Sequence, residues 1–218
     1  MSINIEKYKE ILGELNGKAT LVAVSKTKPI EDILAFYELG QRDFGENYVQ
    51  ELTDKEIALP KDTRWHFIGH LQSNKVKYIA PFVYLIHGVD SLGLLKEVNK
   101  QAAKNNRIID CLLQIHIAKE ETKFGLDEHE LHELQNQLHE LKNVNVKGLM
   151  GMASNSDDAT IIKAEFRFLD ELFEKSKIEN PKFEILSMGM SGDYTIALEE
   201  GSTMVRIGSL LFGERSKK

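Results

Sequence analysis

The stretch Thr20-Leu-Val-Ala-Val-Ser25 is short, almost entirely apolar and rich in β-branched residues. Such runs are typical of strands that are buried on both faces, as in a parallel sheet. Shortly after it, Pro29 precedes the acidic pair Glu31 and Asp32. Proline and acidic side chains both favour the first turn of a helix. The sequence therefore predicts a strand followed at once by a helix, and this unit recurs along the chain.

Seven further strands are expected downstream of residues 20–25. They cover residues 43–46, 65–69, 84–89, 110–117, 146–150, 183–187 and 204–207. Helical patterns lie between them, at about residues 30–40, 48–57, from 73, 91–105, 128–141, 161–173 and 194–200. Asn47 is expected to cap the helix over 48–57. A further helix over residues 3–15 precedes the first strand.

Eight strand-and-helix units predict an α/β fold, a TIM-like parallel (β/α)8 barrel with an extra N-terminal helix. A doubly wound open sheet is the rival architecture. No linker, low-complexity tract or internal repeat divides the chain, so residues 1–218 are expected to form a single domain.

Composition excludes several classes of protein. The net charge of -6 gives no electrostatic support for nucleic-acid binding. No apolar run approaches the roughly 20 residues of a membrane helix, and the polar start is unlike a signal peptide. The one cysteine, Cys111, stands in an apolar run and is expected to be buried and inert. A cytoplasmic protein without membrane or nucleic-acid partners is expected.

In barrels of this kind, active groups lie just past the carboxyl ends of the strands, and phosphate often binds the last two loops. Those loops contain the small residues Gly189, Ser191, Gly192, Gly208 and Ser209. Glycine allows a close approach of backbone to an anion, and Ser191 can donate to phosphate and start the following helix. Ordinary turns would look the same, so these residues leave a phosphate site and plain turns both open.

Lys26 stands at the end of the first strand, beside those loops in a barrel. It is a phosphate counter-ion, a Schiff-base amine or a solvated charge at a strand end. A lysine in a partly desolvated pocket near other cations becomes nucleophilic toward aldehydes. The sequence does not separate Lys26 from Lys28, although Lys28 precedes Pro29 and is expected to be the more exposed of the two.

Other chemical signals are weak. His129 and His132 lack the spacing of two histidines four apart that a metal-binding helix needs, so no metal site is expected. His66, His87 and His116 lie within strands and are interpreted as packed or hydrogen-bonded residues. P-loop, dinucleotide-binding and serine hydrolase motifs are missing.

Six segments carry a resemblance to a known family: AVSKTKP at 23–29, FGENYVQE at 44–51, WHFIGHLQSNK at 65–75, GLM at 148–150, LSMGMS at 186–191 and GSTMVRIG at 201–208. The chain resembles the pyridoxal phosphate (PLP) homeostasis proteins over about its whole length. Their fold resembles the N-terminal barrel of alanine racemase. One departure is the sequence Ser191-Gly192-Asp193-Tyr194, where the family often has an acidic pair; this chain keeps the serine and one acid.

The resemblance implies a set of cofactor-binding residues and no catalytic ones. It implies a PLP Schiff base on Lys26, phosphate binding by Ser191, Gly208 and Ser209, Arg206 near the pyridine nitrogen, and Asn47 near the ring. A permanently charged guanidinium at that nitrogen disfavours its protonation, so the ring is a poorer electron sink. Lys75 and Lys123 lie in matching motifs and either take cofactor transiently or are ordinary surface lysines.

Three functions are weighed. The first is a PLP-binding homeostasis protein that buffers the free aldehyde and passes it to apo-enzymes. The second is a PLP-dependent amino-acid racemase. Alanine racemases add a C-terminal β domain, but this sequence ends at Lys218, directly after residues 211–215. A non-catalytic monomer is therefore expected. The third is an aldolase-like enzyme in which Lys26 binds a phosphorylated substrate.

Overall fold

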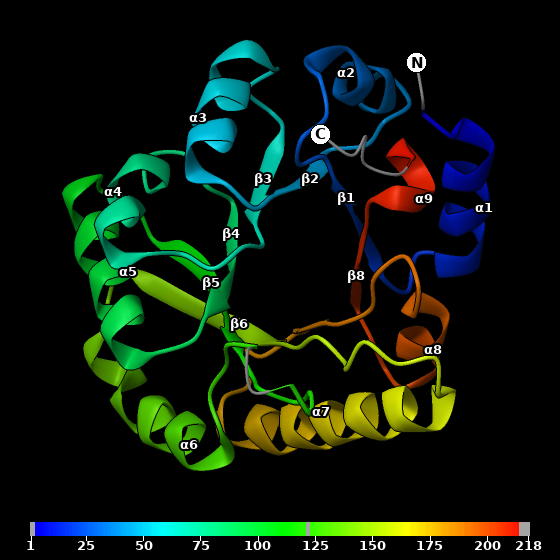
Figure 1. Ribbon diagram of the computed structural model, residues 1–218. Helices are drawn as coiled ribbons and strands as arrows, with labels where there is room; N and C mark the ends of the chain where they lie inside the picture. The colour runs from blue at the N-terminus through cyan, green and yellow to red at the C-terminus, as the bar shows by residue number, and fades with distance from the viewer. Residues whose placement is uncertain (1–2, 121–122, 214–218) are drawn as a thin grey trace.

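The computed structural model describes residues 3–120 and 123–213, and its centre is a closed barrel of eight parallel strands (Figure 1). The strands are β1 (Thr20–Val24), β2 (Asp43–Glu46), β3 (Arg64–Phe67), β4 (Leu85–Val89), β5 (Ile109–Gln114), β6 (Val144–Met150), β7 (Ile185–Ser187) and β8 (Met204–Ile207). Each strand pairs with the next along the chain, and β8 pairs with β1. This closure confirms the predicted barrel and excludes the open sheet.

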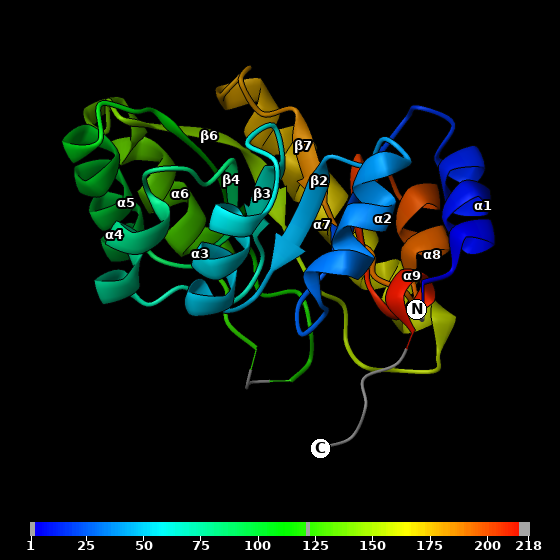
Figure 2. The same cartoon turned by 90° about the horizontal axis from the view of Figure 1, so that it is seen from above.

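Helices surround the barrel on its outside (Figures 1 and 2). They are α1 (Ile5–Leu15), α2 (Ile30–Glu38), α3 (Val49–Ala58), α4 (Val76–Ile79), α5 (Leu92–Lys104), α6 (Glu128–Gln137), α7 (Ala159–Glu179), α8 (Tyr194–Glu199) and α9 (Ser209–Phe212), with 3-10 turns η1 (Ser73–Lys75) and η2 (Leu138–Glu140). In the part of the chain that is described, no helix combines the length and the apolar character needed to cross a membrane.

The strands divide the core into two layers, because successive side chains of a strand point to opposite faces. Ala23, Phe44 and Phe67 belong to the large cluster that packs the strands against the helices. A second, smaller cluster is formed by Val22, Leu85, Leu112, Met150 and Met204. Runs that are apolar at almost every position suit strands with an apolar layer on each side.

The extra helix α1 lies beside α9 (Figures 1 and 2), where the backbone N–H of Asn4 donates to the carbonyl oxygen of Leu211 at 2.7 Å. Its buried residues Tyr8, Ile11 and Leu15 join the outer core layer. The added N-terminal helix is thus confirmed, and it packs against the end of the strand-and-helix series.

Two residues expected to cap or start a helix do not do so. The residue before α3 is Tyr48, which makes no capping hydrogen bond through its side chain, so Asn47 does not cap this helix. Helix α8 begins at Tyr194 after Asp193, so Ser191 does not start it. In both loops the backbone continues past the strand before the helix begins. The side chains of Asn47 and Ser191 are therefore available for other contacts.

Cys111 has the expected position. It lies in β5 and is fully buried, and burial raises the pKa of its thiol well above the ordinary range. A buried thiol that keeps its proton is a poor nucleophile.

Candidate functional site

Four expected site residues gather at the carboxyl ends of β1, β2 and β8. In the β1–β8 ladder Val22 is paired with Arg206, and a side chain built on Gly208 would meet Val24. Lys26 follows the end of β1 by two residues, and Asn47 directly follows β2. Because neighbouring parallel strands end at the same rim, the barrel brings these residues to one mouth.

The backbone on both sides of Lys26 is held in place. Before it, the N–H of Ser25 donates to the carbonyl of Gly45 at 3.0 Å. After it, the N–H of Thr27 donates to Glu51 Oε1 at 2.6 Å, and Thr27 has a φ of 63°, which few non-glycine residues adopt. Lys26 itself is half-buried. The loop therefore presents the lysine from a fixed backbone rather than from a solvated strand end.

The support for this loop is a buried ionic cluster between the barrel and α3. Lys55 Nζ donates to the Ser25 carbonyl, to Glu46 Oε1 and to Glu51 Oε1 at 2.7, 2.7 and 2.6 Å. Ser25 Oγ also donates to Glu46 Oε1, at 2.6 Å. Burial raises the pKa of Glu46, although Lys55 and Ser25 oppose this. Glu46 therefore supports Lys26 through this cluster.

Lys55 was not among the expected site residues. The Glu51–Lys55 spacing of four residues is a common pattern of exposed helix pairs. In the structure only 6% of the Lys55 side chain is exposed. No signal in the sequence distinguishes this pair from the solvated pairs on other helices.

Lys28, like Lys26, is half-buried, and its Nζ donates to the carbonyl oxygens of Phe212 and Gly213 at 2.7 and 3.2 Å. Its amine is thus anchored to the segment after α9.

Arg206 lies in the interior of the barrel, with 4% of its surface exposed. Its Nη1 donates to the carbonyl and the hydroxyl oxygen of Ser187 at 2.8 and 2.7 Å, and its Nη2 donates to the carbonyl of Gly151 at 3.0 Å. Burial lowers the pKa of Arg206 to about 10, while Asp193 opposes the shift. The guanidinium therefore keeps its charge at neutral pH.

The two small-residue loops are joined to each other. The N–H of Gly208 donates to Ser191 Oγ at 3.2 Å, and Ser209 directly follows as the first residue of α9. Gly189 has a φ of 95°, and a side chain there would collide with Ala197. The loop after β7 can therefore fold back toward the loop after β8 only with glycine at this position.

Asn47 borders the same mouth. Its amide oxygen is buried and has no hydrogen-bond partner among the described residues. An unsatisfied buried polar atom costs free energy unless a ligand or water completes it. Asn47 also lines a pocket of about 410 Å³ together with Tyr48, His70, Lys75 and Tyr78. A ligand donor at the mouth would satisfy this oxygen.

Lys75 and Lys123 differ in their surroundings. Lys75 is exposed, and its Nζ lies 5.6 Å from the centre of the Tyr78 ring. Lys123 Nζ donates to the carbonyl of Ala153 at 2.6 Å and pairs with Glu120 at 3.3 Å. Lys123 is thus held by protein groups, whereas Lys75 stands at the pocket beside the mouth.

His66 and His87 lie in β3 and β4 and contact each other, as interpreted. His116 was expected within a strand, but β5 ends at Gln114; its Nε2 lies 2.9 Å from the carbonyl oxygen of Glu120. Among residues 3–120 and 123–213, no group of three or more His, Cys, Asp or Glu side chains is arranged to hold a metal ion.

The chain is similar to known proteins over nearly its whole length. Residues 1–216 match the model of the alanine racemase N-terminal domain. The pyridoxal phosphate homeostasis protein of Aquifex aeolicus (strain VF5) is 45% identical over 213 residues, which cover 97% of this chain and 93% of that protein.

Solved structures agree. PipY of Synechococcus elongatus PCC7942 without PLP has a TM-score of 0.91 at 34% identity, covering 95% of this chain and 99% of that one. Its structure with PLP bound gives a TM-score of 0.88 at 35% identity, with the same coverage. An alanine racemase from Bartonella henselae has a TM-score of 0.74 at 16% identity; the match covers 99% of this chain and 62% of the racemase, and shows a shared fold only.

Proposed function

The chain belongs to the alanine racemase N-terminal domain family and, within it, to the pyridoxal phosphate homeostasis proteins, and we propose that it binds pyridoxal 5'-phosphate in the barrel mouth, as a Schiff base on Lys26. PipY, a solved relative at 35% identity, has been observed with PLP bound. The observation that carries the assignment to this mouth is the β1–β8 register, in which Val22 pairs with Arg206. That register sets Lys26 and the loop at Gly208 on the same rim.

The residues at the mouth fit the parts of the cofactor. Ser191, Gly208 and Ser209 supply the hydroxyl and backbone donors that a phosphate needs. The Arg206 guanidinium offers N–H donors to the ring nitrogen. The buried amide oxygen of Asn47 lacks a partner among the described residues and would accept a hydrogen bond from the ligand.

The covalent step needs only the lysine and the aldehyde of PLP. The deprotonated Lys26 amine adds to the aldehyde carbon, a carbon–nitrogen double bond replaces the carbon–oxygen bond, and one water molecule leaves. PLP supplies an electron sink for carbanion chemistry in enzymes that protonate its ring nitrogen. The charged, buried Arg206 disfavours protonation of a nearby nitrogen. Its position supports a role in holding PLP over a role in catalysis.

We therefore propose a non-catalytic, monomeric, cytoplasmic protein that retains PLP and passes it to apo-enzymes. The name shared by its relatives indicates homeostasis, not turnover of a substrate. Racemization is the alternative activity, suggested by the racemase fold.

An absorption spectrum of the purified full-length chain, before and after borohydride reduction, tests the proposal. We expect a visible band that reduction removes, and a reduced cofactor that peptide mass mapping locates on Lys26. Lys26→Ala should lose the band, whereas the control Lys28→Ala should keep it. Modification of Lys28 instead would overturn the assignment. Interconversion of L- and D-alanine by the PLP-loaded protein would overturn the non-catalytic role.

A further inference from the structure

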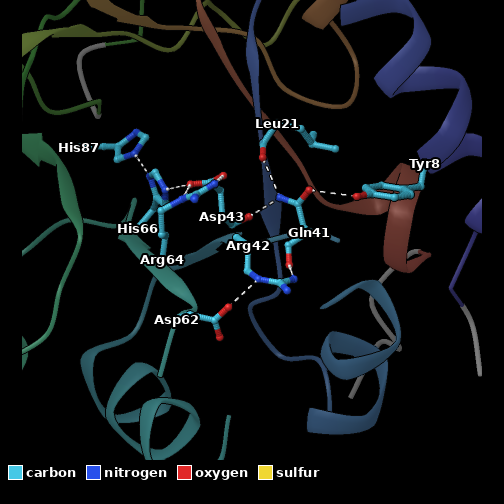
Figure 3. A network of polar contacts seen from close by, with 9 residues as sticks. All are labelled: Tyr8, Leu21, Gln41, Arg42, Asp43, Asp62, Arg64, His66 and His87. Atoms are coloured by element: carbon cyan, nitrogen blue, oxygen red, sulfur yellow. Dashed lines mark hydrogen bonds and ion pairs between the residues drawn. The ribbon is translucent and has the colours of Figure 1, made fainter. Parts of the chain in front are cut away.

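Five polar side chains from five strands form a continuous hydrogen-bonded row inside the barrel, which we call the interior row. It consists of Asp43 (β2), His66 (β3), His87 (β4), Ser187 (β7) and Arg206 (β8). Asp43 Oδ1 lies 3.0 Å from His66 Nε2, and His66 Nδ1 lies 2.9 Å from His87 Nε2 (Figure 3). His87 Nδ1 lies 3.1 Å from Ser187 Oγ, which accepts from Arg206. The row therefore joins the start of β2 to the guanidinium at the proposed cofactor site.

The two ends of the row have fixed hydrogen-bonding roles. Burial would raise the pKa of Asp43, but hydrogen bonds from Arg64 and His66 outweigh it and lower the pKa to about 2. Asp43 is therefore a carboxylate that only accepts at neutral pH. Arg206 stays charged at neutral pH, and a guanidinium only donates. The row thus has a donor at one end and an acceptor at the other.

These ends determine the hydrogens in between. Ser187 Oγ accepts from Arg206, which only donates, so the one acceptor in the row for the hydroxyl hydrogen of Ser187 is His87 Nδ1. Burial, then the nearby His66 and Arg206, lower the pKa of His87 well below its ordinary value, so His87 is neutral and carries one hydrogen. With Nδ1 accepting, that hydrogen is on Nε2 and is donated to His66 Nδ1. His66 then donates from Nε2 to Asp43.

Reversing every hydrogen bond of the interior row leaves a hydrogen without an acceptor. A hydrogen on Nδ1 of His66 would force His87 to accept at Nε2 and to donate from Nδ1 to Ser187 Oγ. The serine hydroxyl would then face donors from both His87 and Arg206, with its own hydrogen left without an acceptor within the row. A buried polar network is stable only when its members are satisfied. One arrangement of hydrogens, running from Arg206 to Asp43, therefore satisfies the row.

We propose that the interior row positions Arg206 for the ring nitrogen of the cofactor. Because the hydroxyl hydrogen of Ser187 goes to His87, a lone pair of Ser187 Oγ is left to accept from the guanidinium, which only donates. Ser187 and the carbonyl of Gly151 then occupy three of the five N–H groups of Arg206. The row also directs its hydrogens away from the site, so it offers no transferable proton to the ring nitrogen.

The identity of the ligand in this inference rests on the proposed function, but the arrangement of hydrogens does not. The first test is therefore made on the full chain after removal of any cofactor, by 15N-detected proton correlation of the imidazoles at neutral pH. His66 and His87 should each show a protonated Nε2 and a bare Nδ1. A doubly protonated ring, or a protonated Nδ1 in either residue, would overturn the row.

The second test compares two buried serines. Ser187→Ala removes one acceptor of Arg206, whereas Ser202→Ala removes a hydroxyl that donates to the carbonyl of Met188 at 2.7 Å and lies outside the row. Ser187→Ala should weaken PLP binding about tenfold and shift the visible band, while Ser202→Ala should bind like the wild type. Equal binding by wild type and both variants would show that Ser187 does not position Arg206.

A third variant covers the case in which Ser187→Ala does not fold. Asp43→Asn replaces the obligate acceptor by an amide that can also donate. Its imidazole spectrum should still show His87 protonated at Nε2, because Arg206 and Ser187 fix that end of the row whichever residue stands at position 43. A protonated Nδ1 on His87 in this variant would contradict control of the row by Arg206 and Ser187. If wild type shows the expected tautomers but binds no PLP, the proposed function fails and the hydrogen arrangement stands.

Discussion

The Nζ atom of Lys55 lies 2.7 Å from the carbonyl oxygen of Ser25, the residue immediately before Lys26. The same ammonium donates to Glu46 and Glu51, so its three donors have three acceptors. Glu51 in turn accepts the N–H of Thr27, the residue after Lys26. One buried cation thus ties α3 to the backbone on both sides of the proposed cofactor lysine.

Lys55→Met should reduce the free energy of unfolding by about 3–5 kcal/mol, because it leaves the buried carboxylate of Glu46 without its cation. Urea unfolding measures this loss. Lys61→Met is the matched control, since Lys61 pairs with Glu56 at the surface with 69% of its side chain exposed, and should cost under about 1 kcal/mol. Equal losses in the two variants would show that the Lys55 cluster does not stabilise the loop.

Low pH should reduce the free energy of unfolding of the protein, partly through protonation of Asp43. Its pKa in the folded chain is lowered from an ordinary 3.8 to about 2, so its contribution is present above pH 3.8 and is lost as the pH falls toward 2. The contribution is about 2 kcal/mol. Urea unfolding measured at a series of pH values should show this loss of the free energy of unfolding in the wild type and in the exposed control Asp54→Asn. If the free energy of unfolding of Asp43→Asn falls with pH as much as that of the wild type, Asp43 does not make this contribution.

Ser191→Ala should release PLP more readily without unfolding the protein. The variant loses a hydroxyl from the proposed phosphate site and the hydrogen bond from Gly208, which costs about 1 kcal/mol of stability. Equilibrium dialysis measures cofactor retention, and thermal melting measures the fold. The exposed Ser73→Ala is the control. Equal retention in wild type and Ser191→Ala would remove Ser191 from the phosphate site.

Gly148→Ala should be among the most destabilising single changes. Gly148 has a φ of 152°, and a side chain there would overlap the carbonyl oxygen of Ile185 in the neighbouring strand β7. We expect a loss of about 4 kcal/mol or more in urea unfolding. Gly13→Ala in α1 is the control, because open space surrounds this position and alanine favours a helix by up to about 1 kcal/mol. Normal stability of Gly148→Ala would contradict the β6–β7 register.

The barrel was predictable because each strand has a local signature. Strands β2 and β8 have the predicted bounds. The residues that cap the helices were less predictable. Asn47 and Ser191 have the chemistry of capping residues, yet α3 and α8 begin beyond them. Capping chemistry and ligand-binding chemistry use the same side chains, so residue type does not separate the two roles.

The sequence by itself determined the alternation of strands and helices, the family, and which lysine and arginine to examine, because these depend on residue type and short-range order. Only the tertiary structure decided which residues contact and position this lysine and this arginine. Lys55 lies 30 residues from the Ser25 carbonyl that it binds, and His87 lies 100 residues from Ser187. Closing the barrel is what makes these groups neighbours, and burial turns their pairing into a requirement, because an unpaired charge or hydrogen-bonding group inside the protein has no water to replace its partner.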